Sequence, residues 1–222
     1  MSPSGEGSAP RLRDGWTVTT HDWSHDVDAA HLDEAARAVH GLGEAMSLHL
    51  VLEVIAYADD EAGWAGRRGE VTVTLRETEV EVADEGRGTD TRRDEHGRPV
   101  RKPVMATRDV RFFDAQEPPS LPDGRPRRGM STVAAVSPLL VHENRRAEGA
   151  WRQSYRHGRP DTELHEVSGD GGTGTTVTVR LPSAEAVDVD ALRSLVQGFS
   201  HVSVTVVRDG GIGAGPGWHG AG

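Results

Sequence analysis

Residues 44–62 read EAMSLHLVLEVIAYADDEA, and this stretch decides how the rest of the chain is interpreted. It is rich in helix formers, and its apolar residues recur every three or four positions, as the buried side of a helix requires. The apolar set is Leu48, Val51, Leu52, Ile55, Ala58 and Ala62. A neighbouring face of the same helix carries His49, Glu53, Tyr57, Asp60 and Glu61. The stretch therefore predicts a core helix with one unusually polar face.

Patterns on either side of this helix predict a single α/β domain. Valines at every second position, or short apolar runs, indicate strands, and helix formers with capping residues indicate further helices. The predicted strands cover 70–75, 79–83, 140–143, 150–156, 162–167, 175–181 and 202–207, and the other predicted helices cover 33–39, 131–140 and 189–197. Residues 89–130 are expected to form mostly a long loop of the kind that covers or binds a ligand. We expect a two-layer α/β (α+β) sandwich, with a mixed sheet of about eight strands and helices on one face.

Composition narrows the range of functions. The chain has 222 residues, of which 35% are hydrophobic, and this suits one domain over 13–208 with an arm over 1–12 and a glycine-rich tail over 209–222. A formal charge of −10 argues against a module that binds nucleic acid through a basic face. There is no cysteine, signal peptide or long apolar run, so we expect a cytoplasmic protein without disulfides, thiolate metal sites or a membrane segment.

Six short motifs then occur in a fixed order. They are His49-Leu-Val-Leu-Glu-Val-Ile55, Asp60-Glu-Ala62, Asp84-Glu-Gly-Arg-Gly88, Gly129-Met-Ser131, Trp151-Arg-Gln153 and Thr173-Gly-Thr-Thr-Val177. Each motif alone is weak, but their order and spacing resemble the ATP-binding domain of DNA gyrase B. That domain belongs to the GHKL, or Bergerat-fold, ATPases of the type II topoisomerase kind. The resemblance spans residues 44–208 and implies a Bergerat-type fold that binds ATP.

The resemblance assigns Glu53 as the general base that activates water, with His49 one turn earlier orienting or tuning it. It assigns Asp84 as the acceptor for the adenine amino group, assisted by the hydroxyl of Thr175, often through a water. The residues allow plainer interpretations too. A lone glutamate on a helix is usually a solvated side chain, and an aspartate before glycine usually stabilises a turn.

Further pocket residues follow from the same resemblance. Gly86, Arg87 and Gly88 line the base pocket, Glu61 pairs with Arg87, and Arg152 lies at the pocket mouth. Tyr57 is counted among the nucleotide-binding residues, and the segment Gly129, Met130 and Ser131 forms the phosphate end. The alternatives are a weak surface ion pair for Arg87 and an ordinary strand surface for Arg152.

Two departures from the family pattern bear on the chemistry. Ala56-Tyr57 stands where the family has Asp-Asn, and that asparagine is the family's Mg²⁺ ligand, so metal binding is in doubt. The phosphate lid, rich in glycine in the family, here reads Gly124-Arg-Pro-Arg-Arg-Gly-Met-Ser131, which we call the arginine loop. Its arginines could neutralise phosphate by charge, or could be an ordinary solvated loop feature.

The resemblance ends before the family's transducer and DNA-cleaving portions, so DNA strand passage is not expected from this chain alone. We expect a domain that binds ATP and hydrolyses it slowly, if at all. The alternatives are a non-hydrolysing adenine nucleotide sensor, a pseudo-enzyme kept as an interaction surface, and, least favoured, a protein phosphotransferase. The expected partner is an adenine nucleotide; a protein partner or homodimer is left open, and direct DNA binding is not expected.

Overall fold

The computed structural model describes residues 27–89, 92–100, 103–113, 115–168, 171–182 and 187–209. The expected arm over 1–12 and all but the first residue of the expected tail over 209–222 lie outside these ranges. The domain boundaries proposed from the sequence therefore stay predictions.

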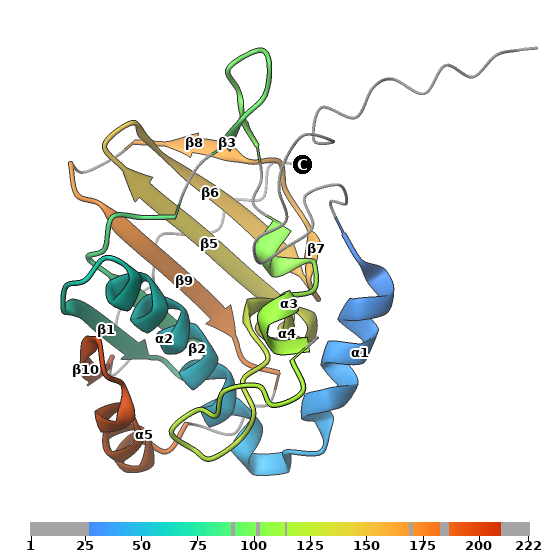
Figure 1. Ribbon diagram of the computed structural model, residues 1–222, viewed down its shortest axis with the longest axis vertical. Helices are drawn as coiled ribbons and strands as arrows, with labels where there is room; N and C mark the ends of the chain where they lie inside the picture. The colour runs from blue at the N-terminus through green and yellow to red at the C-terminus, as the bar shows by residue number, and fades with distance from the viewer. Residues whose placement is uncertain are drawn as a thin grey trace, which may run out of the picture.

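A mixed eight-stranded sheet forms one layer of the domain (Figure 1). Its order is β10-β1-β2-β9-β5-β6-β7, and β8 also pairs with β6. The strands are β1 (Gly69–Leu75), β2 (Glu79–Asp84), β5 (Leu139–Arg146), β6 (Gly149–Arg156), β7 (Arg159–Pro160), β8 (His165–Val167), β9 (Gly174–Arg180) and β10 (Val202–Arg208). β10 runs parallel to β1 and the other neighbours are antiparallel, which confirms the predicted mixed sheet.

The longer helices pack together over the sheet (Figure 1). α2 (Met46–Trp64), preceded by η1 (Gly43–Ala45), contacts β1, β2 and β10, while α4 (Met130–Val136) contacts α2 and β6. α1 (Ala29–His40) packs against α4, and α5 (Val189–Leu195), followed by η3 (Val196–Gly198), packs against β10. The predicted long loop contains a protruding hairpin, β3 (Arg92–Arg93) and β4 (Pro99–Val100), then η2 (Pro103–Met105) and α3 (Val110–Phe113).

The core lies between α2 and the sheet. Alternate residues of β1 and β2, including Val73 and Val82, are buried against Leu52 and Ile55 of α2. On the predicted polar face of α2, His49, Glu53 and Tyr57 are buried, while Asp60 and Glu61 are partly exposed. The burial of Glu53 contradicts the plainer interpretation of this residue as a solvated helix side chain.

Several element boundaries differ from the sequence prediction. The helix expected over 131–140 ends at Val136, because Pro138 disfavours helical backbone at Ser137, which is extended. The strand expected over 162–167 shortens to His165–Val167. The first helix begins earlier than predicted, at Ala29, because the Asp28 side chain accepts the His31 N–H and caps its amino end.

Among the described residues no single helix has the length and apolar character of a membrane span. One pair, Ala29–His40 with Gly43–Trp64, meets the length and composition criteria together, but it is bent by 119°. Its second member is the core helix of this domain.

Candidate functional site

Asp84 closes β2 on the side of the sheet that faces the helices, two residues after the buried Val82. Its Oδ1 accepts the Gly86 N–H at 2.7 Å, and both the backbone N–H and the hydroxyl of Thr175 also donate to the carboxylate. Burial raises the pKa of Asp84 above its ordinary value, and these hydrogen bonds partly offset that effect. The structure therefore brings Asp84 and Thr175 together, as the resemblance implies.

The close approach of β9 to Asp84 depends on glycine. Gly174 has φ +138°, and a Cβ placed there would lie 1.9 Å from the carbonyl oxygen of Asp84. An ionised carboxylate offers about four acceptor positions, and donors from the part of the chain that the structure describes occupy three of them. About one acceptor position of Asp84 is left for a donor such as an amino group.

A small pocket adjoins Asp84 between α2, β1 and the turn after β2. Its lining includes Ala58, Ala62, Val71, Gly86 and Val202. The volume of about 20 Å³ is room for about one water molecule. A purine is larger than this, so its entry requires movement of the turn after β2 and of the side chains that border the pocket.

Arg87 and Glu61 border the same pocket and pair with each other. Nε and Nη2 of Arg87 each lie 3.3 Å from Glu61 Oε2, and the guanidinium lies 4.7 Å from the ring centre of Trp64. Trp64 is 76% exposed, so this edge of the pocket faces solvent. Gly88, with φ +74°, lets the turn pack against β5, since a Cβ there would lie 2.4 Å from the carbonyl oxygen of Arg145.

Glu53 lies farther along α2, fully enclosed and 0% exposed. Its two carboxylate oxygens accept backbone N–H groups of the arginine loop, from Arg128 at 2.5 Å and from Gly129 at 2.9 Å. Burial raises the pKa of Glu53 above its ordinary value, while the two amides and the charges of His49 and Arg127 lower it. In this conformation the carboxylate has no contact with solvent water.

His49 links Glu53 to the segment before the arginine loop. Its Nε2 lies 3.6 Å from Glu53 Oε1, and its Nδ1 lies 2.8 Å from Asp123 Oδ2. The two carboxylates therefore flank one imidazole, which fixes the orientation of the ring. Sequence reasoning missed Asp123, because nothing about an aspartate in a proline- and glycine-rich turn marks it as a partner of a helix histidine.

Polar groups of the predicted phosphate end, residues 129–131, are hydrogen-bonded within the protein. The Gly129 N–H is bound to Glu53, and the Ser131 hydroxyl lies 2.8 Å from His31 Nε2 in a buried contact. Met130 is buried in the core. Gly129 thus lies next to Glu53, and the Gly129 amide and the Ser131 hydroxyl are already engaged within the protein.

Arg127 reaches over α2 from the arginine loop. Its Nη1 lies 2.8 Å from Asp60 Oδ1, its Nε lies 4.0 Å from Glu53 Oε2, and its guanidinium lies 4.5 Å from the ring centre of Phe112. Arg111 binds the second oxygen of Asp60 at 3.2 Å. Asp60 is thus held between two guanidinium groups.

These surroundings do not suit a divalent metal. Tyr57, the residue expected from the resemblance to stand at the metal-ligand position, is buried, and the carboxylates of Glu53 and Asp60 are engaged by amides and guanidinium groups. Across the described part of the chain, no group of three histidine, aspartate or glutamate side chains is placed to hold an ion. At a nucleotide site Mg²⁺ takes most of its oxygen ligands from phosphate and water and needs one or two protein groups, and both nearby carboxylates are already engaged in this conformation.

Arg152 lies away from the other predicted site residues. The strand register places it opposite Glu143, which in turn pairs with Thr176 of β9, and Thr176 pairs with Ala83 of β2. These positions alternate with the helix-facing ones, so they lie on the opposite face of the sheet. Arg152 is 53% exposed and binds Glu143 Oε2 through Nη2 at 2.6 Å. The structure therefore does not bring Arg152 to the pocket at Asp84.

The fold of this domain is similar to that of a solved structure. That structure is the topoisomerase IV ATP-binding domain of Francisella tularensis in complex with a small-molecule inhibitor. The TM-score is 0.54 and the sequences are 23% identical, over 72% of this chain and 45% of that one. The fold is of the Bergerat type. No model of a known protein family matches the sequence.

The likeness bears on the fold alone at this level of identity. The chain spans 45% of the length of the structure it matches. It carries the mixed sheet and the helical layer of the ATP-binding fold, and the candidate site residues other than Arg152 lie on the helix-facing side of that sheet or in the helices and loops over it.

Proposed function

We propose that the chain binds an adenine nucleotide, with the base held at Asp84. The observation that carries this proposal is the remaining acceptor position of a partly buried carboxylate at the end of β2, beside a pocket. The adenine amino group is a donor that matches that acceptor. The similarity to a structure described as an ATP-binding domain supports the same assignment.

In this proposal the nucleotide extends along α2, from the Glu61 end of the helix toward Glu53. Glu53 acts as the general base once the arginine loop withdraws and gives up its two hydrogen bonds to the carboxylate. A raised pKa favours proton acceptance near neutral pH, but the enclosed state denies the carboxylate a water. Hydrolysis is therefore slow and depends on opening of the loop.

A non-hydrolysing nucleotide sensor is the second candidate. The hydrogen bonds from the Arg128 and Gly129 amides to Glu53 favour it, because a loop fixed on the base is an element that nucleotide binding can displace. Action on DNA topology is not part of either proposal. A partner protein or a second copy of the chain would bind the arginine loop in its displaced position.

Calorimetric titration with ATP, ADP and GTP tests the binding, and phosphate release with ATP tests the hydrolysis. We expect ATP and ADP to bind and GTP to bind more weakly, since its base presents a carbonyl to Asp84. Phosphate release that stops in Glu53→Ala but continues in Glu44→Ala, a change of an exposed glutamate before the same helix, supports the enzyme. Binding without release supports the sensor, and absence of binding contradicts both.

A further inference from the structure

We propose that Arg127 is the phosphate-binding cation of this site and makes nucleotide binding independent of a divalent metal. The inference rests on the proposed adenine nucleotide binding and adds how the phosphates are recognised. It starts from the engagement of both nearby carboxylates, Glu53 by backbone amides and Asp60 by two guanidinium groups, which leaves neither of them free to hold Mg²⁺.

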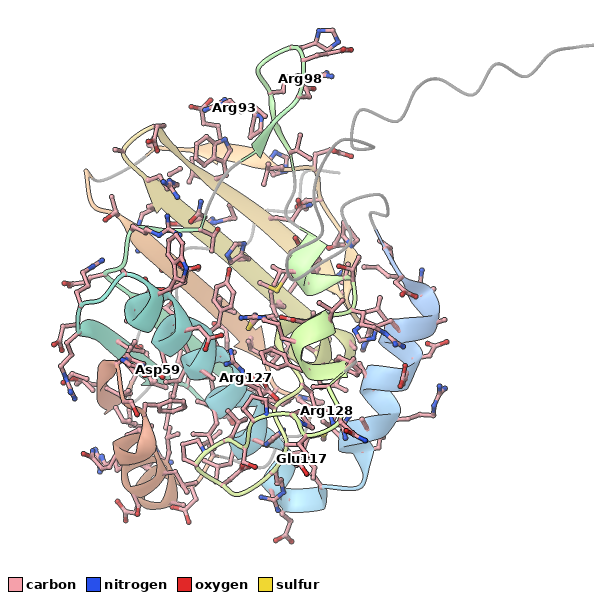
Figure 2. All side chains as sticks on the ribbon, viewed as in Figure 1. Asp59, Arg93, Arg98, Glu117, Arg127 and Arg128 are labelled. Atoms are coloured by element: carbon pink, nitrogen blue, oxygen red, sulfur yellow. The ribbon has the colours of Figure 1, made fainter. Side chains whose placement is uncertain are left out.

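The position of Arg127 suits this role. It contacts α2 at both Glu53 and Asp60, which lie about 10 Å apart along the helix axis at the usual rise per residue. Figure 2 shows Arg127 against α2 in the helical layer. Its guanidinium thus lies between the Glu61 end, where the base is proposed to bind, and the Glu53 end, where the terminal phosphate would react.

The hydrogen bonding of Arg127 is incomplete. The side chain is 8% exposed, and among the described residues its Nε–H finds no acceptor within hydrogen-bonding distance. Buried N–H groups are normally satisfied, so this N–H is available to donate to an oxygen acceptor. A phosphate oxygen would supply it, and the planar guanidinium can bind phosphate through two parallel N–H groups.

The two other arginines of the arginine loop are less suitable. Arg125 is 38% exposed and its guanidinium binds Asp123. Arg128 is more exposed than Arg127, and its guanidinium lies 6.0 Å from the ring centre of Phe113. Only Arg127, of these three, is both buried and within 4.0 Å of Glu53.

Asp60 keeps a cationic partner when Arg127 exchanges partners. When Arg127 turns from Asp60 to a phosphate, Asp60 keeps Arg111, which binds its other oxygen at 3.2 Å. Arg127 is also adjacent in sequence to Arg128 and Gly129, whose amides hold Glu53. A phosphate that draws Arg127 away from α2 therefore pulls on the same segment that covers the base.

Equilibrium binding of ATP, ADP and adenosine to the full chain, with Mg²⁺ or with EDTA, tests the inference. We expect EDTA to change ATP affinity less than about twofold. Arg127→Gln should weaken ATP and ADP binding about tenfold or more and leave adenosine binding unchanged, and Arg127→Lys should fall between. The matched control Arg108→Gln removes the same charge from the surface pair with Glu34 and should bind as the wild type does.

The outcomes separate the two proposals. If ATP binding needs Mg²⁺ and Arg127→Gln binds ATP normally, the role of Arg127 is wrong while the adenine site stands. If neither ATP nor adenosine binds to the wild type, the adenine site itself is wrong. Retained adenosine binding by Arg127→Gln shows that this variant is folded, so a selective loss of ATP and ADP is attributable to the phosphates.

Discussion

Glu53 Oε2 accepts a hydrogen bond from the Gly129 N–H at 2.9 Å, between residues 76 positions apart in the chain. The contact joins the middle of the core helix to the start of α4, and the Arg128 N–H completes it on the other carboxylate oxygen. One side chain thus holds the arginine loop closed and is itself closed off from water. Water can therefore reach the Glu53 carboxylate only when the arginine loop moves away from it.

The first prediction concerns this loop. Glu53→Ala removes both acceptors, so we expect the amides of Arg128 and Gly129 to exchange hydrogen at least about tenfold faster and trypsin to cleave after Arg127 or Arg128 more readily. Hydrogen exchange followed by mass spectrometry measures the first effect. The control Glu44→Ala leaves the loop contacts intact. Unchanged exchange in Glu53→Ala would show that other contacts hold the loop.

The second prediction concerns pH. Burial raises the pKa of the Glu53 carboxyl in the folded protein above its ordinary value of 4.5, so the folded state binds this proton more tightly than the unfolded chain does. The stabilisation from this group is then fully present below the unfolded-state pKa and is lost as pH rises through the folded-state pKa. Glu53→Gln cannot titrate and lacks this dependence.

Urea unfolding of the wild type and of Glu53→Gln, from about pH 4 to pH 8, checks this effect. The unfolding free energy of the wild type relative to the variant should fall as the pH rises. The subtraction removes contributions that the two proteins share, such as that of Asp84. A relative stability that rises with pH would mean that the hydrogen bonds to Glu53 outweigh its burial.

The third prediction concerns the contact of β9 with Asp84. Gly174→Ala forces a Cβ against the Asp84 carbonyl oxygen, so we expect a loss of about 2 kcal/mol or more in unfolding free energy and weaker adenine binding. Gly171→Ala is the matched control, because Gly171 also has a positive φ, +85°, but a Cβ there meets nothing within 4 Å. It should lose about 1 kcal/mol and keep adenine binding. Equal losses in both variants would argue against the close contact.

The sequence predicts the fold well because periodicity and local chemistry determine it. The valine alternation of β1 and β2 and the apolar stripe of α2 both appear where expected. Asp84 and Thr175 also meet as the resemblance implies, since neighbouring strands in fixed register bring them together. Pairings within one sheet follow from the order of the strands.

The state of Glu53 could not be predicted in the same way. Its burial depends on how a long loop folds back, and no periodicity encodes the contact of an amide at Gly129 with a carboxylate at Glu53. Arg152 could not be placed from the sequence for a different reason. The motif match predicts that it lies in a strand, but only the strand register shows which face of the sheet it occupies. The partners of Arg127 likewise depend on tertiary packing.

Titration of the pure chain with ATP, for the wild type and for Asp84→Asn, tests the central claim most directly. The amide keeps the shape of the carboxylate but replaces an acceptor with a donor, and the control Glu85→Ala changes the neighbouring exposed acid. The account predicts saturable ATP binding that weakens about tenfold or more in Asp84→Asn and is unchanged in Glu85→Ala. ATP binding of equal strength in wild type and Asp84→Asn, or no binding by the folded wild type, would contradict it.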